Sequence, residues 1–169
     1  MYLHYIWATN RMKYIKGKKK LQPYRGCILC GVAKNKPGVI KKVLYKDKLM
    51  MVIMNVFPYN VGHVQVVPVR HVENLEDLTD EEYVRFFELI RKSVIMIKKA
   101  FSPLGFNIGL NIGGDISGGS ILHLHAQIVP RYKRDLGFLE VTADTKVMPM
   151  TVEQAFRELK KHAKILRDG

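Results

Sequence analysis

The chain has 169 residues, of which 47% are hydrophobic and 25% charged, and its formal net charge is +13. This composition excludes a disordered polypeptide and fits a single globular domain over residues 1–169. The longest apolar run, Leu49–Met54, is shorter than the roughly 18 to 20 residues of a membrane span, and Met1–Lys20 lacks the apolar core of a signal peptide. We therefore expect a cytoplasmic protein without a membrane partner. The positive charge predicts an anionic partner or substrate, such as nucleic acid or a phosphorylated small molecule.

Residues 1–25 form a basic arm. Residues 11–20 carry six lysine or arginine side chains, with Tyr14 and Tyr24 nearby. Basic side chains interleaved with aromatic ones contact phosphates and bases, so the arm is a candidate nucleic-acid patch. A solvated arm without a partner is the alternative interpretation.

Cys27 and Cys30 are the two cysteines of the chain and form a C-x2-C pair. Two cysteines do not make a disulfide framework. Thiolates at this spacing can hold a soft metal, although histidines would then have to complete a tetrahedral zinc site. A redox dithiol and incidental free thiols are the alternatives.

Apolar runs in the middle of the chain indicate strands. Leu49–Met54 and Gly62–Pro68 flank a loop over residues 55–60, which predicts a hairpin, and a Lys/Gly/Pro turn over residues 34–42 precedes them. Residues 106–112 alternate apolar with small or polar side chains, which predicts a third strand.

Two capping boxes predict the starts of helices. Thr79 and Glu82 precede a stripe at helical spacing that ends before Ser102 and that we expect in the core: Tyr83, Phe86, Phe87, Ile90, Val94, Ile97 and Phe101. Thr151 and Gln154 precede an amphipathic C-terminal helix. The order of elements predicts an α+β fold with an antiparallel β-sheet, a long helix and a C-terminal helix.

Residues 118–131 contain most of the candidate functional side chains of the chain. From Leu122 onward polar and apolar residues alternate, which predicts a strand with His123, His125 and Gln127 on its wet face. The preceding loop over residues 113–120 is rich in glycine and serine, so its backbone N–H groups can face an anion, and a phosphate cradle is predicted in preference to a plain hairpin turn. Arg131, on the same face, either steers anions or is an ordinary surface charge.

The segment from His123 to Gln127 resembles the signature of the histidine triad (HIT) superfamily, His-x-His-x-His followed by apolar residues. Gln127 in place of the third histidine is similar to the nucleotidyltransferase branch, which includes galactose-1-phosphate uridylyltransferase and the diadenosine tetraphosphate phosphorylases. The resemblance extends over residues 7–15, 55–68, 71–79 and 106–139, and it implies a HIT-like fold.

The resemblance implies a role for individual site residues. His125 would be the nucleophile that attacks the α-phosphorus and forms a nucleotidyl-histidine intermediate. Gln127 would donate its amide N–H to a phosphate oxygen, Ser120 and Asn111 would contact phosphate, and Asn55 would bind the ribose.

The resemblance also implies a structural zinc ion held by Cys27, Cys30, His71 and His123. His123 would then be structural and His125 catalytic. Family members of this kind are usually homodimers, with the long helix and a sheet edge at the interface.

The leading functional hypothesis is nucleotidyl transfer on dinucleoside polyphosphates, with an adenine nucleotide substrate and phosphate as the acceptor. A hydrolase of dinucleoside polyphosphates or nucleoside phosphoramidates is the alternative with the same first step. A nucleotide- or RNA-binding module, motivated by the basic arm and the charge of +13, is the alternative from another class.

Overall fold

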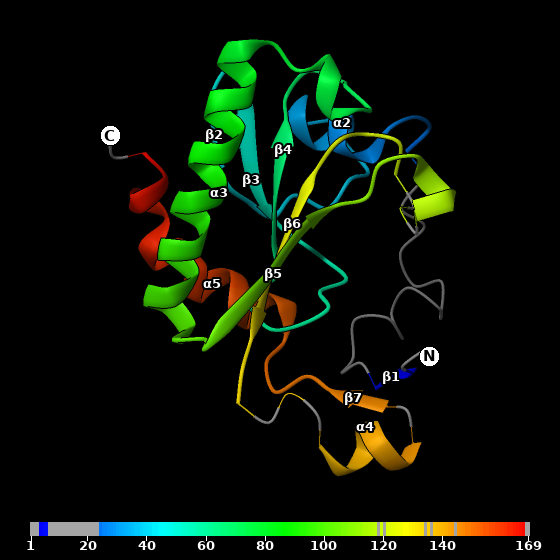
Figure 1. Ribbon diagram of the computed structural model, residues 1–169, viewed down its shortest axis with the longest axis vertical. Helices are drawn as coiled ribbons and strands as arrows, with labels where there is room; N and C mark the ends of the chain where they lie inside the picture. The colour runs from blue at the N-terminus through cyan, green and yellow to red at the C-terminus, as the bar shows by residue number, and fades with distance from the viewer. Residues whose placement is uncertain are drawn as a thin grey trace.

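A computed structural model describes residues 4–6, 24–117, 119, 121–133, 135, 137–143 and 145–167. Most of the basic arm and Ser120 therefore lie outside the described residues. Figure 1 shows a central sheet with helices packed on it. No helix in the described part of the chain is long and apolar enough to cross a membrane.

Among the described residues, five strands form an antiparallel sheet in the order β2-β3-β4-β6-β5. Their bounds are Val43–Lys46 for β2, Met50–Met54 for β3, Val64–Pro68 for β4, Gly105–Leu110 for β5 and Ala126–Arg131 for β6. The predicted hairpin is confirmed, since β3 and β4 pair from Met50 opposite Pro68 to Met54 opposite Val64. The α+β class is confirmed as well.

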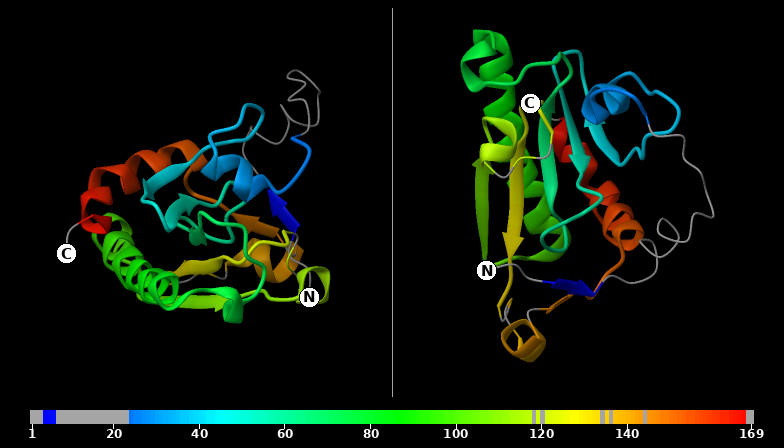
Figure 2. Two further views of the ribbon diagram at one scale, coloured as in Figure 1. Left: turned by 90° about the horizontal axis from the view of Figure 1, so that it is seen from above. Right: turned by 90° about the vertical axis from the view of Figure 1, so that its right-hand side faces the viewer.

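Both faces of β3 and β4 are covered, which explains why these strands read as continuous apolar runs. One face packs on the long helix α3, Asp80–Phe101, and on the C-terminal helix α5, Val152–His162. The other face packs on the short helix α2, Ile28–Ala33, through Met51, Ile53 and Val67. Figure 2 shows α2 and α3 on opposite sides of the sheet.

The two predicted capping boxes are present. Thr79 and Glu82 exchange hydrogen bonds at the start of α3, and Thr151 and Gln154 do so at the start of α5. Helix α3 ends at Phe101. Its C-cap Ser102 adopts a left-handed backbone with φ of 48°, and Pro103 follows.

The predicted core stripe of α3 is only partly correct. Phe86 and Ile97 are fully buried, but Tyr83 and Phe87 are 48% and 42% exposed. The sheet and α5 cover a narrower sector of the helix than the apolar pattern spans. Part of the apolar surface of α3 therefore faces outward.

Two strand boundaries and several short elements differ from the sequence prediction. Strand β6 begins at Ala126 and not at Leu122, and β5 ends at Leu110 and not at Ile112. Elements α2 and β2 were not predicted, nor were helix α4, Phe138–Ala143, strand β7, Thr145–Val147, and strand β1, His4–Ile6, which pairs in parallel with β7. Such short segments carry too little periodicity to be recognised locally. The single-domain organisation stays a prediction.

Candidate active site and adjoining metal-ligand cluster

Residues 121–125 form a bent segment that leads into β6. The backbone N–H of Leu124 donates to the carbonyl oxygen of Val72 at 2.7 Å, and that of His123 donates to Ile121 at 2.9 Å. These bonds replace pairing with β5, so the strand cannot begin before Ala126. The expectation that the histidines lie on a wet strand face was therefore wrong: His123 and His125 are 2% and 4% exposed.

His125 has a defined tautomer. Its Nδ1 lies 2.7 Å from the carbonyl oxygen of His123. A carbonyl oxygen can only accept, so Nδ1 carries the proton and donates it. Nε2 is left with its lone pair, 3.0 Å from the amide nitrogen of Gln127. The ring therefore presents the lone pair of Nε2 to an amide N–H donor.

The orientation of the Gln127 amide is fixed by strand β4 and the loop before it. Its oxygen Oε1 accepts from His63 Nε2 at 2.6 Å and from Gln65 Nε2 at 3.1 Å. His63 Nδ1 in turn accepts the backbone N–H of Tyr59 at 3.1 Å, so the His63 proton is on Nε2. With its oxygen held in this way, Gln127 must turn its NH₂ group toward His125.

His63 is a site residue that sequence reasoning missed. It is fully buried, and burial lowers its pKa from 6.5 to about 4, which keeps it neutral near pH 7. The signal available was a polar imidazole between Gly62 and an apolar strand, since a buried histidine needs hydrogen-bond partners.

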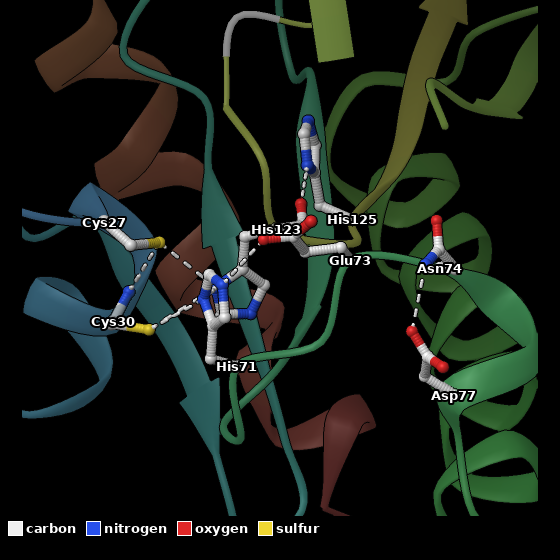
Figure 3. Close-up of polar contacts among 8 residues, drawn as sticks. All are labelled: Cys27, Cys30, His71, Glu73, Asn74, Asp77, His123 and His125. Atoms are coloured by element: carbon white, nitrogen blue, oxygen red, sulfur yellow. Dashed lines mark hydrogen bonds and ion pairs between the residues drawn. The ribbon is translucent and has the colours of Figure 1, made fainter. Parts of the chain in front are cut away.

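The side chains of Cys27, Cys30, His71 and His123 converge on one point (Figure 3). Their four ligand atoms, two Sγ and two Nδ1, lie within 4.8 Å of one another. Cys27 Sγ is 3.2 Å from His123 Nδ1, Cys30 Sγ is 3.3 Å from His71 Nδ1, and the two Nδ1 atoms are 3.3 Å apart. A tetrahedral zinc ion with ordinary bond lengths would separate its sulfur and nitrogen ligands by about 3.4 to 3.8 Å.

The Nε2 atoms of His123 and His71 also support a metal site at this cluster. His123 Nε2 donates to the carbonyl oxygen of Pro68 at 3.0 Å, and His71 Nε2 donates to the Glu73 carboxylate at 3.3 Å. These acceptors place the protons on Nε2 and leave both Nδ1 lone pairs toward the sulfurs, as metal-ligating histidines require. Burial also lowers the pKa of His123 to about 4, so this ligand is neutral. The donor set and its surroundings fit a metal ion.

The structure places three of the predicted substrate-binding residues, Asn55, Asn111 and Gln127, around His63 or in one hollow. Asn55 follows β3, with Nδ2 3.4 Å from His63 Nδ1 and Oδ1 accepting from the backbone N–H of Phe57. Asn111 and Gln127 line one hollow. Whether these side chains bind ribose or phosphate stays a prediction.

The glycine-rich loop contains a short 3₁₀ turn, Gly114–Ser117, and Gly113 and Gly114 have positive φ. Its role as a phosphate cradle stays a prediction, and Ser120 lies outside the residues described. Arg131 forms an ion pair with Asp135 at 2.7 Å and a hydrogen bond to Asn107 at 2.8 Å, so its guanidinium is held in place.

The fold and this arrangement define an α+β protein with a buried histidine-x-histidine segment, in which one imidazole turns Nε2 toward Gln127 and the other faces a cysteine pair. The HIT domain model matches residues 37–134. The chain therefore belongs to the HIT family.

Named relatives agree with this assignment. An AP-4-A phosphorylase of Mycobacterium tuberculosis is 39% identical over 161 residues, which cover 93% of this chain and 83% of the relative. A bis(5'-nucleosyl)-tetraphosphatase of Schizosaccharomyces pombe is 40% identical over 94 residues, 56% of this chain and 51% of that protein. A zinc-bound histidine triad protein of Mycobacterium smegmatis has the same fold, with a TM-score of 0.67 and 22% identity over 84% of this chain and 96% of that one.

Proposed function

We propose that the protein is an enzyme that transfers a nucleotidyl group from a dinucleoside polyphosphate to phosphate, as an AP-4-A phosphorylase does. The observation that carries the proposal is the orientation of His125, whose Nε2 is free of its proton because Nδ1 donates to the His123 carbonyl. The M. tuberculosis phosphorylase, similar over 93% of this chain, supports the choice of substrate.

In the first step, His125 Nε2 forms a bond to the α-phosphorus, and the bond from that phosphorus to the bridging oxygen breaks. The electron pair leaves with the nucleoside triphosphate. In the second step, an oxygen of inorganic phosphate attacks the same phosphorus and releases His125. The amide nitrogen of Gln127 lies 3.0 Å from His125 Nε2, and its N–H donates to an oxygen of the transferred phosphate in both steps.

Gln127 also favours phosphate over water as the acceptor. Water must lose a proton when it attacks, and an amide cannot take one, whereas an ionised phosphate oxygen needs no general base. The His63 contact, which fixes the amide oxygen, preserves this arrangement.

Incubation with diadenosine tetraphosphate, with and without inorganic phosphate, tests the proposal. We expect ADP and ATP, formed only when phosphate is present. AMP and ATP formed without phosphate would instead identify a hydrolase, the activity that the name of the S. pombe relative indicates for that protein. Absence of products with the wild-type protein would contradict the proposed substrate and favour another nucleotide substrate or the binding module, and His125→Ala is the control for a contaminating activity.

We further propose that the cysteine and histidine cluster holds a structural zinc ion. Two thiolates and two imidazoles complete four-coordination, and such a set is typical of a closed tetrahedral site. The zinc would join α2 to the segment after β4 and to the segment before β6. Metal analysis of protein produced in zinc-supplemented medium should give one zinc per chain, and none in Cys27→Ala/Cys30→Ala.

The homodimer implied by the family resemblance is a further proposal. Strand β5 is at the edge of the sheet, and Tyr83 and Phe87 of α3 are half exposed. Sedimentation should show a dimer that Phe87→Glu converts to a monomer, with Glu81→Gln as a control on the same helix.

Residues 7–23, most of the basic arm, lie outside the described part of the chain, so the structure does not test the RNA-binding alternative. That alternative and the cytoplasmic location stay predictions from the sequence.

A further inference from the structure

The loop over residues 55–63 connects β3 to β4 and carries Asn55 and His63 at its two ends. The backbone N–H of Asn55 donates to the carbonyl oxygen of His63 at 3.0 Å, which closes the loop. Near the return, Gly62 has a φ of 81°, and a Cβ built there would lie 2.8 Å from the ring of Phe101. The ends of the loop are thus fixed by the sheet and by close packing.

The middle of the loop is anchored by Asn60, whose side chain is buried with 4% exposed. Its Nδ2 donates to the carbonyl oxygen of Pro130 and to Asp135 Oδ1, both at 3.0 Å. Its Oδ1 accepts the backbone N–H of Val61 at 3.0 Å. Both amide protons and the oxygen are therefore used. Pro130 belongs to β6 and lies beyond the end of its pairing with β4, so the Asn60 amide supplies the donor for this carbonyl.

The carboxylate that receives Asn60 is itself held in place. Asp135 Oδ2 accepts from Arg131 Nε at 2.7 Å and from the backbone N–H of Tyr132 at 3.0 Å. Arg131 also donates to Asn107 of β5 at 2.8 Å. Burial alone would raise the pKa of Asp135, but the bonds from Arg131 and Asn60 hold this pKa below its ordinary value. The anchor is therefore a charge-assisted hydrogen bond to a fixed acceptor.

Tyr59, in the middle of the same loop, sets the tautomer of His63. The backbone N–H of Tyr59 donates to His63 Nδ1 at 3.1 Å, whereas the amide nitrogen of Asn55 lies farther from this atom, at 3.4 Å. An N–H donor at Nδ1 requires the ring proton to be on Nε2. From Nε2, His63 donates to Gln127 Oε1 at 2.6 Å.

The other tautomer of His63 would disturb the amide of Gln127. With the proton on Nδ1, Nε2 could only accept, and it would repel the Gln127 oxygen that it now binds. Turning the amide over would break the bond from Gln65 to that oxygen, 3.1 Å long, and aim the oxygen at the lone pair of His125 Nε2. The amide would then have no single preferred orientation.

We propose that Asn60 is a positioning residue that sets the tautomer of His63. Its side chain anchors the loop to β6, the strand that carries Gln127, and the anchored loop holds the Tyr59 N–H on His63 Nδ1. The Nε2 proton then fixes the Gln127 amide. The consequence for catalysis rests on the proposed function, whereas the link from Asn60 to His63 does not.

Nitrogen NMR of the histidine rings in Asn60→Ala tests this link directly. In the wild type, His63 should show a protonated Nε2 and an unprotonated Nδ1, assigned by the loss of these signals in His63→Gln. In Asn60→Ala the shifts of the two nitrogens should move toward each other, as in a mixture of tautomers. Unchanged His63 shifts in the folded variant would overturn the proposal.

Tyr132→Phe is the matched control. The Tyr132 hydroxyl donates to the carbonyl oxygen of Val61 at 3.0 Å, so this variant removes another bond between the same loop and the segment after β6. It should lower the thermal midpoint and leave both the His63 tautomer and turnover unchanged. The same change of tautomer as in Asn60→Ala would show that any loosening of the loop suffices, and would refute a specific role for Asn60.

An exchange of the two partners provides a rescue. Asn60→Asp places a second carboxylate against Asp135, and the two should repel and give mixed His63 tautomers. Adding Asp135→Asn restores an amide opposite a carboxylate and should recover the thermal midpoint and the wild-type tautomer. The Pro130 carbonyl lacks its donor in both variants, so it does not affect this comparison. Recovery of the midpoint without the tautomer would show that the contact is only structural.

Turnover of diadenosine tetraphosphate tests the catalytic consequence. Asn60→Ala should lower kcat about tenfold, with a smaller change in KM. In a His63→Ala background the same substitution should leave kcat within about twofold, because no tautomer remains to be set. Losses that multiply would show that Asn60 acts by another route. A wild type without turnover would refute the proposed substrate, while the NMR comparison would still decide the link between Asn60 and His63.

Discussion

His123 and His125 are separated by one residue and are both buried, yet their rings donate to backbone carbonyls from different nitrogens. His123 donates from Nε2 to Pro68 and turns Nδ1 toward the two sulfurs. His125 donates from Nδ1 to His123 and turns Nε2 toward Gln127. Identical side chains therefore have different chemistry available, and in each case a backbone carbonyl selects the tautomer.

This contrast shows how the proposed metal site and the proposed nucleophile can be neighbours without competing. The ligand contributes its side chain to the cluster and its carbonyl oxygen to the nucleophile. Replacing the His123 side chain therefore keeps the bond that orients His125, whereas replacing His125 leaves the cluster complete. The following predictions separate the two histidines.

The largest expected effect is on turnover in His125→Ala. Removing the nucleophile should lower kcat by roughly four orders of magnitude or more, because no other group can form the covalent intermediate. Zinc content and the thermal midpoint should stay near those of the wild type. Substantial turnover in this variant would contradict the assignment of His125, whatever its metal content.

Removal of the metal should reduce stability. A ligand present at a thousand times its Kd stabilises the folded state by about 4 kcal/mol, so chelation should lower the free energy of unfolding by a similar amount. Denaturant titrations with and without chelator measure this difference. The free energy of unfolding of Cys27→Ala/Cys30→Ala should not change with chelator. If that of the wild type does not change either, the metal does not stabilise the fold.

Acid should destabilise the fold through His63. The pKa of His63 is lowered from 6.5 to about 4 by burial, so between these values the unfolded chain binds more protons than the folded one. Stability from this group is complete above pH 6.5 and falls toward pH 4, by about 3 kcal/mol. Unfolding titrations at several pH values should show a correspondingly smaller loss in His63→Gln, and equal losses would place the acid sensitivity elsewhere.

The smallest effect concerns the orientation of Gln127. His63→Ala removes the donor 2.6 Å from Gln127 Oε1 and should lower kcat roughly 10- to 100-fold, since a misplaced amide no longer meets the transferred phosphate. His63→Gln can still donate at that position and should recover part of the rate with little change in KM. If both variants lose the same activity, His63 acts through packing and not through its N–H.

Sequence reasoning succeeded where the signal was local. The capping boxes at Thr79 and Thr151 located the starts of two helices, because side-chain and backbone groups three residues apart satisfy each other. The short helix α2 carries no comparable signal, and its N-cap is Cys27 itself. Its position depends on packing against Met51, Ile53 and Val67, which no local pattern encodes.

The sequence by itself determined the family signature, the β3–β4 hairpin, the two capped helices and the residue types available for chemistry. Only the tertiary structure decided that His123 and His125 are buried, that His63 holds Gln127, and that Cys27 and His123, 96 residues apart, are in contact. Residue types and local periodicity are properties of neighbouring positions. Burial, convergent ligands and the bond from His123 to Pro68 involve atoms from distant parts of the chain, so they exist only once the sheet has formed.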